Sequence, residues 1–347
     1  MSRPRRLLVA LLALALLAAA CGSDDDATPV DGTDTLGDAT ITVYSSRSEE
    51  LIQPVFDAFE TATGATVEVR YGKTDEITLA LEAEGDRSPA DVYIGQSPGA
   101  VGFLDQAGLL APLGAATLDR VGAAYRASSG NWVGITGRVR VLVYNTDRVD
   151  PAELPGSILD LTDPAFAGRV GVAPGNGSFQ DFVTAMRADL GDEATGEWLA
   201  GMAANDSPNY EKNGAIVDAV ARGEVDMGLV NHYYLLEFLE EDPSLPAANY
   251  TFPEGDLGSL LITSAAGVVS ASDQPANAEA LIQYLLSDEA QAQSAAGESE
   301  YPLVAGVAAP EGLAPLAELA AITVDLDVLA DGLRGTQSLI ENSGLIQ

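Results

Sequence analysis

The sequence predicts an α/β fold built from two lobes. Predicted strands alternate with predicted amphipathic helices along most of the chain, an order typical of a largely parallel sheet covered by helices. About three hundred residues follow the leader and its linker, which is more than a single hydrophobic core usually supports. Two long β-rich segments, residues 132–145 and 257–270, have the character of strands that link two lobes.

The chain opens with a predicted secretory signal in residues 1–20. Three arginines, Arg3, Arg5 and Arg6, precede an unbroken apolar run from Leu7 to Ala20. This run is too short for a comfortable membrane span and ends in small residues, as a signal segment does before its cleavage site. We therefore expect the protein to be exported.

Cys21 is a predicted lipidation site. The stretch Leu17-Ala18-Ala19-Ala20-Cys21 resembles a bacterial lipobox, in which the cysteine carries lipid after cleavage, although its leucine stands one place further from the cysteine than usual. Cys21 is the single cysteine of the chain, so an intrachain disulfide is excluded. The alternative is an ordinary signal peptide followed by an incidental cysteine. Residues 21–38, rich in Gly, Asp and Thr, have the composition of a flexible tether.

Composition excludes several classes of function. The formal charge is −35, from 17 basic and 52 acidic residues, and clustered basic residues that would bind nucleic acid are missing. With one histidine and one cysteine, Ser-His and Cys-His catalytic arrangements have almost no room. Carboxylate pairs are too numerous to exclude a hydrolase, so catalysis stays open as an alternative to a binding function.

The first lobe is expected to comprise residues 39–135 together with 264–300. Residues 39–45 alternate as a strand does, and apolar residues from 51 to 59 recur at helical spacing until Gly64. A strand at 67–71, a helix at 74–84 and a strand at 90–96 complete a βαβα order.

The second lobe is expected to comprise residues 136–263 together with 301–347. Its predicted elements are a strand at 168–174, helices at 178–190 and 215–223, and a strand at 225–230. From Asn277 onward the chain is expected to be mostly helical.

Tyr233 and Tyr234 stand side by side where the last of these strands meets a helix. Two phenols in that position offer two hard oxygen donors to one trivalent cation. Adjacency alone is weak evidence in a chain of eleven tyrosines, and the pair could simply cap a core with its hydroxyls in water.

Nearly the whole mature chain resembles the extracellular solute-binding proteins of ATP-driven importers, and within them the bacterial ferric-ion-binding proteins. The resemblance rests on the order and spacing of several stretches, namely ITVYSSRSEELIQPVFDAFE, SPADVYIGQ, GRVRVLVYNT, GVAPGNGSFQDFVTAMR, YEKNG and GEVDMGLVNHYYL. It implies the two-lobed periplasmic-binding-protein fold of type II, in which two hinge strands allow the lobes to close over a ligand.

The resemblance also implies a ferric-ion site. In this family a tyrosine pair after Asn-x supplies phenolate ligands to Fe³⁺, which assigns Tyr233 and Tyr234, and a third phenolate is expected from Tyr144. Other branches of the family place histidine and glutamate where this chain has Ser48 and Gly95. The pattern is therefore closest to members with three tyrosines and a small anion that completes the metal shell.

The expected anion is carbonate or a similar ion. Asn176, Gly177 and Ser178 open a predicted helix, whose free N–H groups favour an anion, and the family's corresponding loop binds one, as do asparagines at the places of Asn213 and Asn231. Arg47 and Arg138 are candidates for its counter-charge. The alternatives are that Ser178 is only a helix cap, that the asparagines satisfy turns, and that the arginines form structural ion pairs.

Further residues are expected near the ligand without a defined role. His232, between Asn231 and the tyrosines, is expected to point away from the metal. Residues that could line the cleft are Tyr44, Ser48, Glu49 and Gln96.

The predicted function is that of a lipid-anchored receptor, monomeric and without catalytic turnover, which captures Fe³⁺ outside the cytoplasmic membrane and delivers it to the permease of an ABC importer. The main alternative is the same fold binding a small organic or phosphate-bearing solute without metal, with the tyrosines as stacking surfaces. An adhesive surface protein is a third class, but it would not require convergent tyrosines and a helix end.

Overall fold

The computed structural model describes residues 36–346, with the exception of residues 320 and 325. The predicted signal segment, Cys21 and most of the predicted tether lie outside the described residues. Within the described part of the chain, every helix is too short or too polar to cross a bilayer.

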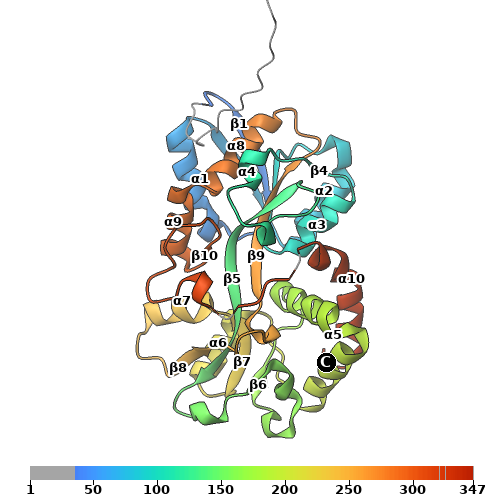
Figure 1. The fold of residues 1–347 in the computed structure, drawn as a ribbon, viewed down its shortest axis with the longest axis vertical. Coiled ribbons are helices and arrows are strands. Elements are labelled where there is room, and N and C mark those ends of the chain that lie inside the picture. Colours follow the sequence, from blue (N-terminus) through green and yellow to red (C-terminus); the bar gives the residue numbers. More distant parts are fainter. Residues whose placement is uncertain (1–35, 320, 325, 347) are drawn as a thin grey trace, which may run out of the picture.

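A ten-stranded sheet runs through both lobes, and two of its strands connect them. The strand order is β2 (Thr66–Tyr71), β1 (Thr40–Ser45), β3 (Val92–Gly95), β9 (Leu261–Val269), β5 (Trp132–Asn145), β7 (Met227–Asn231) and β6 (Val170–Gly171). β5 and β9 pair in antiparallel fashion along the middle. β9 continues into a pairing with β3 in the first lobe, whereas β5 continues into a pairing with β7 in the second. Figure 1 shows both strands passing from the upper lobe to the lower one, as the sequence predicted for residues 132–145 and 257–270.

The first lobe is formed by a parallel set of strands covered by helices. α1 begins after β1 and buries Ile52, Val55, Phe56 and Phe59 along one side, and it ends where Gly64 takes the left-handed conformation with φ of 77°. The elements of this lobe are β1 (Thr40–Ser45), α1 (Glu49–Thr63), β2 (Thr66–Tyr71), α2 (Thr74–Glu84), β3 (Val92–Gly95), α3 (Pro98–Gln106), β4 (Leu110–Ala111), α4 (Ala115–Leu118), α8 (Pro275–Leu285) and α9 (Asp288–Glu298).

The second lobe repeats the α/β arrangement around the far half of β5. Its long helix α5 is divided at Gly191, whose φ of 84° interrupts the helical backbone, so the helix predicted for residues 178–190 is its first part. The elements are β6 (Val170–Gly171), α5 (Gly177–Ala204), α6 (Asn213–Ala221), β7 (Met227–Asn231), α7 (Tyr233–Glu241) and β8 (Ala247–Tyr250).

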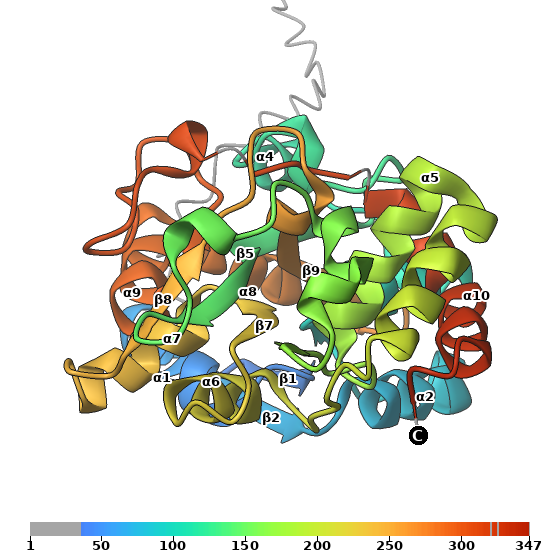
Figure 2. The same ribbon diagram turned by 90° about the horizontal axis from the view of Figure 1, so that it is seen from below.

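The C-terminal part is less helical than the sequence predicted. After α9 the chain forms the short strand β10 (Tyr301–Pro302) and a segment largely without regular structure, before α10 (Leu326–Asn342). Prolines and glycines explain the difference, because they interrupt helices; they are Pro302, Gly306, Pro310, Gly312 and Pro315. α10 packs against α3 and α5, one helix from each lobe, and Figure 2 shows it beside α5. The predicted residue boundaries of the lobes stay a prediction.

The two faces of β5 differ in chemistry. Val139, Val141 and Val143 belong to one hydrophobic cluster of the second lobe. Because side chains alternate along a strand, Arg138 and Arg140 share the opposite face. Both arginines are buried, so this strand carries two guanidinium groups into the junction between the lobes.

Candidate functional site

The tyrosine pair lies where β7 ends and α7 begins. Tyr233 is buried and Tyr234 half-buried, and their rings stack with centroids 4.3 Å apart and an interplanar angle of 29°. The register of the sheet sets Asn231, the last residue of β7, opposite Arg140 on β5. The pair is therefore held beside the charged face of a strand that connects the lobes.

Both charge and burial act on Tyr233. Burial raises the pKa of Tyr233 well above its ordinary value, the neighbouring Tyr234 adds to the rise, and the positive charge of Arg138 opposes it. At neutral pH Tyr233 is therefore a neutral phenol. A group of this kind ionises only when a strongly charged cation replaces its proton.

The residues predicted to bind an anion are joined in one hydrogen-bond network. Arg140 donates from Nη1 to Asn231 Oδ1 at 3.0 Å and lies 3.5 Å from Asn213 Oδ1. Asn231 Nδ2 donates to Ser178 Oγ at 3.1 Å, and Asn213 Nδ2 donates to Asn176 Oδ1 at 3.4 Å. Asn176 Oδ1 also accepts from the backbone N–H of Ser178 at 3.0 Å, as a helix cap does. The structure thus brings together four of the predicted residues from three elements.

Gly177 stands between two of these residues as the first residue of α5. No atom lies within 4 Å of the place that a Cβ would occupy there. The backbone at the start of α5 is therefore uncrowded, and the reason for glycine at this position is not a steric one.

Arg140 is the central member of the network and was missed by the sequence reasoning. Burial lowers its pKa to about 10, so it remains positively charged at neutral pH, and the nearby Tyr234 and Tyr233 support the charge. The available signal was the spacing in GRVRVLV, because a period of two places Arg140 on the same face as Arg138.

Arg47 and Arg138 flank a buried carboxylate. Arg47 Nη1 donates to Glu300 Oε2 at 2.9 Å and to Thr136 Oγ1 at 3.2 Å, and Arg138 Nη1 lies 3.5 Å from Glu300 Oε1. Thr136 also donates a short hydrogen bond to Glu300. Burial opposes ionisation of Glu300, but the two arginines outweigh it and lower its pKa. The Arg47 guanidinium is thus engaged in an internal ion pair, the alternative that the sequence left open.

His232 is held by both of its ring nitrogens. Nδ1 accepts from the backbone N–H of Val139 at 3.2 Å, which leaves Nε2 to carry the proton and donate to the Ser299 carbonyl at 2.8 Å. Burial lowers its pKa to about 4, so the ring is neutral. Neither nitrogen is free for a metal, and this sole histidine instead connects a strand that joins the lobes to the segment after α9.

Tyr144 is not brought to the tyrosine pair. It lies opposite Met227 at the start of β7, whereas Tyr233 and Tyr234 follow the end of that strand. Four residues of β5 separate it from Arg140, which corresponds to about 13 Å in an extended chain. Its ring packs against a hydrophobic cluster that contains residues of both lobes. The resemblance suggested Tyr144 as a third phenolate, and the register of the sheet places it elsewhere.

Tyr44, predicted to line the cleft, is directed toward α2. Its hydroxyl donates to Glu84 Oε1 at 3.2 Å and accepts from Arg70 Nη1 at 3.2 Å, and the Arg70 guanidinium lies 4.9 Å from its ring centroid. The side chain thus packs and hydrogen-bonds within the first lobe.

The remaining predicted residues of the first lobe lie in two loops. Ser48 is the residue that precedes α1, and it and Glu49 are exposed. Gln96 is half-buried, and its backbone N–H donates to Ser46 Oγ at 2.9 Å. At Gly95 a Cβ would lie 2.4 Å from a methyl group of Val101, so a glutamate there would require the Val101 side chain to move.

Among the described residues, no group of three or more His, Cys, Asp and Glu side chains is arranged to hold a metal ion. A metal at this junction would therefore depend on phenolate oxygens and on an anion.

Comparison with known families decides what kind of protein this is. The family model for bacterial extracellular solute-binding proteins matches residues 87–324, well over half of the chain. The chain belongs to the bacterial extracellular solute-binding proteins. The family predicted from the sequence is confirmed.

Several members of this family are similar along most of their length. A relative from Serratia marcescens, named Fe(3+)-binding periplasmic protein, is 35% identical over 293 residues, which are 83% of this chain and 86% of the relative. The iron-bound structure of HitA from Pseudomonas aeruginosa has a TM-score of 0.84 at 34% identity and covers 88% of this chain and 99% of its own. A Trichodesmium protein in complex with iron and citrate has a TM-score of 0.80 at 28% identity, covering 89% of this chain and all of its own.

These matches confirm the predicted fold class, since this solute-binding protein has the two-lobed type II architecture of ferric-binding proteins. They cover both lobes and the strands β5 and β9 between them. The tyrosine pair and the hydrogen-bond network of Arg140, Asn231, Asn213, Ser178 and Asn176 thus lie at the lobe junction of a solute-binding protein.

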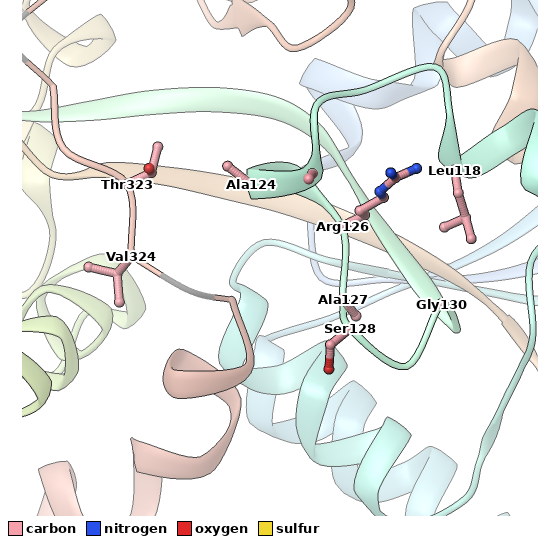
Figure 3. Close-up of a pocket in the computed structure, with 9 residues that line it drawn as sticks. Leu118, Ala124, Arg126, Ala127, Ser128, Gly130, Thr323 and Val324 are labelled. Atoms are coloured by element: carbon pink, nitrogen blue, oxygen red, sulfur yellow. The ribbon is translucent and has the colours of Figure 1, made fainter.

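Two hollows of this solute-binding protein lie away from the tyrosine pair. One, of about 490 Å³, lies between the turn after α4 and the segment before α10 and is shown in Figure 3. Its charged residue, Arg126, pairs with Asp119 at 2.7 Å. The other, of about 610 Å³, lies between α2, α3 and α10. Neither of these two is lined by the tyrosines or by the network.

Proposed function

We propose that this protein captures Fe³⁺ between its lobes through the phenolates of Tyr233 and Tyr234, together with a small anion, and delivers it to an ABC importer. The observation that carries the proposal is the stacked tyrosine pair beside the buried network of Arg140 and Asn231. It combines hard donors for a trivalent cation with donors for an anion.

The protonation of the tyrosines fits a trivalent load. Burial keeps Tyr233 neutral without metal, so a weakly charged cation would gain little from it. Fe³⁺ is a hard and highly charged ion that displaces phenolic protons, and its uptake then releases protons. Two phenolates leave one positive charge of the metal uncompensated, which an anion would neutralise.

The anion is proposed to bind at the start of α5. Asn176 caps this helix by accepting from the Ser178 N–H, and the positive end of the helix dipole at this point favours negative charge. Asn213 and Asn231 connect this end to the Arg140 guanidinium. Hydrogencarbonate, the protonated form that dissolved carbonate takes near neutral pH, is an ion of suitable size and charge. Arg138 is the further candidate for counter-charge, because its ion pair with Glu300 is longer, at 3.5 Å, than the 2.9 Å pair that Arg47 forms with the same carboxylate.

The names of similar proteins support iron as the load. The Serratia relative is named for Fe(3+) binding, and the similar Pseudomonas structure is iron-bound. The Trichodesmium structure contains iron with citrate, which supports the view that the metal is held with an anion.

The protein is further proposed to act as a monomeric receptor without turnover, held at the outer face of the cytoplasmic membrane by lipid on Cys21. The leader and the stretch before Cys21 support this placement. A Cys21→Ser variant would then leave the membrane fraction, and retention of that variant with the membrane would contradict the anchor.

The test of iron capture is a visible titration of the purified protein without its leader. With ferric citrate and bicarbonate we expect a broad phenolate-to-iron charge-transfer band, strongly reduced in Tyr234→Phe. Tyr144→Phe is the matched control, because Tyr144 lies at the other end of β7, and it should keep the band.

A protein that stays colourless and retains no iron would contradict the proposal. Binding of a small organic or phosphate-bearing solute by the same network would then be favoured. A band that disappears in Tyr144→Phe but persists in Tyr234→Phe would contradict the assignment of the ligands.

A further inference from the structure

A carboxylate that no sequence pattern singled out stands next to the anion network. Asp181 follows Ser178 by three residues on α5, so the two side chains share one face of the helix. Its side chain is 1% exposed. Oδ1 accepts a hydrogen bond from Ser97 Oγ at 2.7 Å, whereas Oδ2 is buried without a hydrogen-bond partner in the described part of the protein.

The Arg138 guanidinium, in the same region, has hydrogen-bond donors without an acceptor in the described part of the chain. Arg138 is 1% exposed, and its Nε, Nη1 and Nη2 make no hydrogen bond to the described residues. Its nearest charged neighbour is Glu300, at 3.5 Å. Arg138 and Arg140 both act electrostatically on Asp181. Arg138 and Asp181 are thus buried charges that interact electrostatically, and each keeps polar atoms without a hydrogen-bond partner among the described residues, which buried groups rarely do.

We propose that Asp181 selects the anion, admitting oxyanions that carry a proton, such as hydrogencarbonate or hydrogenphosphate, and rejecting fully ionised ones such as sulfate. The proposal rests on the anion site of the proposed function. An ionised carboxylate only accepts hydrogen bonds, so it pairs with the O–H of a protonated anion. A sulfate ion brings only acceptors, and its negative charge would face Asp181 without a proton between them.

The first lobe fixes which oxygen of Asp181 is available. Ser97 precedes α3, and it occupies Oδ1 from across the junction. A Cβ at Gly99 would lie 3.5 Å from the same oxygen, so α3 approaches the carboxylate closely. Oδ1 is therefore occupied, and Oδ2 is the oxygen proposed to meet the proton of the anion when the lobes are in contact.

Burial raises the pKa of Asp181 to about 6, against the effects of Ser97 and of the two arginines. The carboxyl is therefore ionised at about pH 8, where inorganic phosphate is present as hydrogenphosphate. At that pH, hydrogenphosphate and sulfate are both tetrahedral and divalent, and only hydrogenphosphate carries a proton. A difference in their affinities therefore reports on the proton and not on shape or charge.

The experiment measures the affinity of the iron-free protein for phosphate and for sulfate by calorimetry at about pH 8. We expect phosphate to bind at least about 100-fold more tightly, since sites built around a ligand O–H discriminate strongly against analogues that lack it. In Asp181→Asn the amide can donate to sulfate, and the ratio should fall to about 10-fold or less. Ser128→Ala, in the first lobe and away from Asp181, is the control and should keep the preference for phosphate.

Each other result overturns the proposal. A wild-type ratio near one, binding of neither anion, or an unchanged ratio in a folded Asp181→Asn variant would each show that Asp181 is only a counter-ion of the arginines. If the Asp181→Asn variant fails to fold, the ratio of phosphate to sulfate affinity in the wild type still tests the proposal. Because the measurement contains no iron, a strong preference for phosphate in a protein that gives no charge-transfer band would contradict iron capture and leave the selection by Asp181 standing.

Discussion

The two lobes contribute unequally to their junction. On the second-lobe side, Tyr233 and Tyr234 adjoin a continuous network of Arg140 and Asn231. The residues that the first lobe was expected to contribute are used within that lobe or stand in its loops, as with Tyr44 on Glu84 and Arg47 on Glu300. In the proposed function, the second lobe therefore carries the ligand chemistry, while the first lobe supplies closure and internal charge balance.

The largest expected effect is the dependence of iron affinity on pH, which tests whether the second lobe supplies the metal ligands. Tyr233 is a neutral phenol before the metal binds, because its pKa is raised. If each of the two tyrosines loses a proton on binding, affinity falls by about 100-fold for each unit of decrease in pH. We expect release of about two protons per iron in a pH-stat, corrected for protons taken up by citrate.

Two variants sharpen this measurement. Tyr234→Phe should reduce the release by about one proton, as expected for a single lost phenolate. Tyr44→Phe, in the first lobe, should leave it unchanged. Equal losses in both variants would show that the lobes share the metal ligands.

A smaller effect distinguishes a structural arginine from a ligand. Glu300 is 1% exposed between Arg47 and Arg138, and Glu300→Gln would leave these two buried charges uncompensated. Removing one partner of a buried ion pair typically costs about 3–5 kcal/mol of folding free energy, which urea unfolding of the iron-free protein would measure. Arg222→Gln, which breaks an exposed pair with Asp218, is the control and should change stability by less than about 0.5 kcal/mol.

If Glu300→Gln unfolds like the wild type, the cluster is not a structural ion pair. Arg47 would then be available as an anion ligand, and the contrast between the lobes would weaken.

The sequence predicted most of the fold because its elements follow local rules. The strand at 132–145 and the helix at 74–84 have the predicted bounds, since β-rich composition and helical spacing indicate them directly. The segment between β10 and α10 is less helical than predicted, because its prolines and glycines interrupt helices.

The site was less predictable because it depends on sheet register and on contacts between distant segments. Tyr233 and Asn231 follow from one local motif, but the place of Tyr144 depends on how β5 pairs with β7. The place of Asp181 at the junction between the lobes depends on its hydrogen bond with Ser97, which lies 84 residues earlier in the chain. Periodicity does not indicate such contacts, because only the folded chain brings these residues together.

The smallest expected effect concerns the direct contact between the lobes. Ser97→Ala removes the hydrogen bond that the first lobe donates to Asp181. A hydrogen bond to a charged group contributes about 1.5–3 kcal/mol, but water replaces part of it when the lobes separate, so we expect iron affinity to fall by about 5- to 20-fold. Small-angle scattering of the iron-free variant should also show a larger radius of gyration than the wild type. Ser128→Ala, in the first lobe and away from Asp181, is the control. If Ser97→Ala binds iron as tightly as the wild type and keeps its compact shape, the lobes are held together by α10 and the two connecting strands, and the first lobe contributes no polar contact to closure.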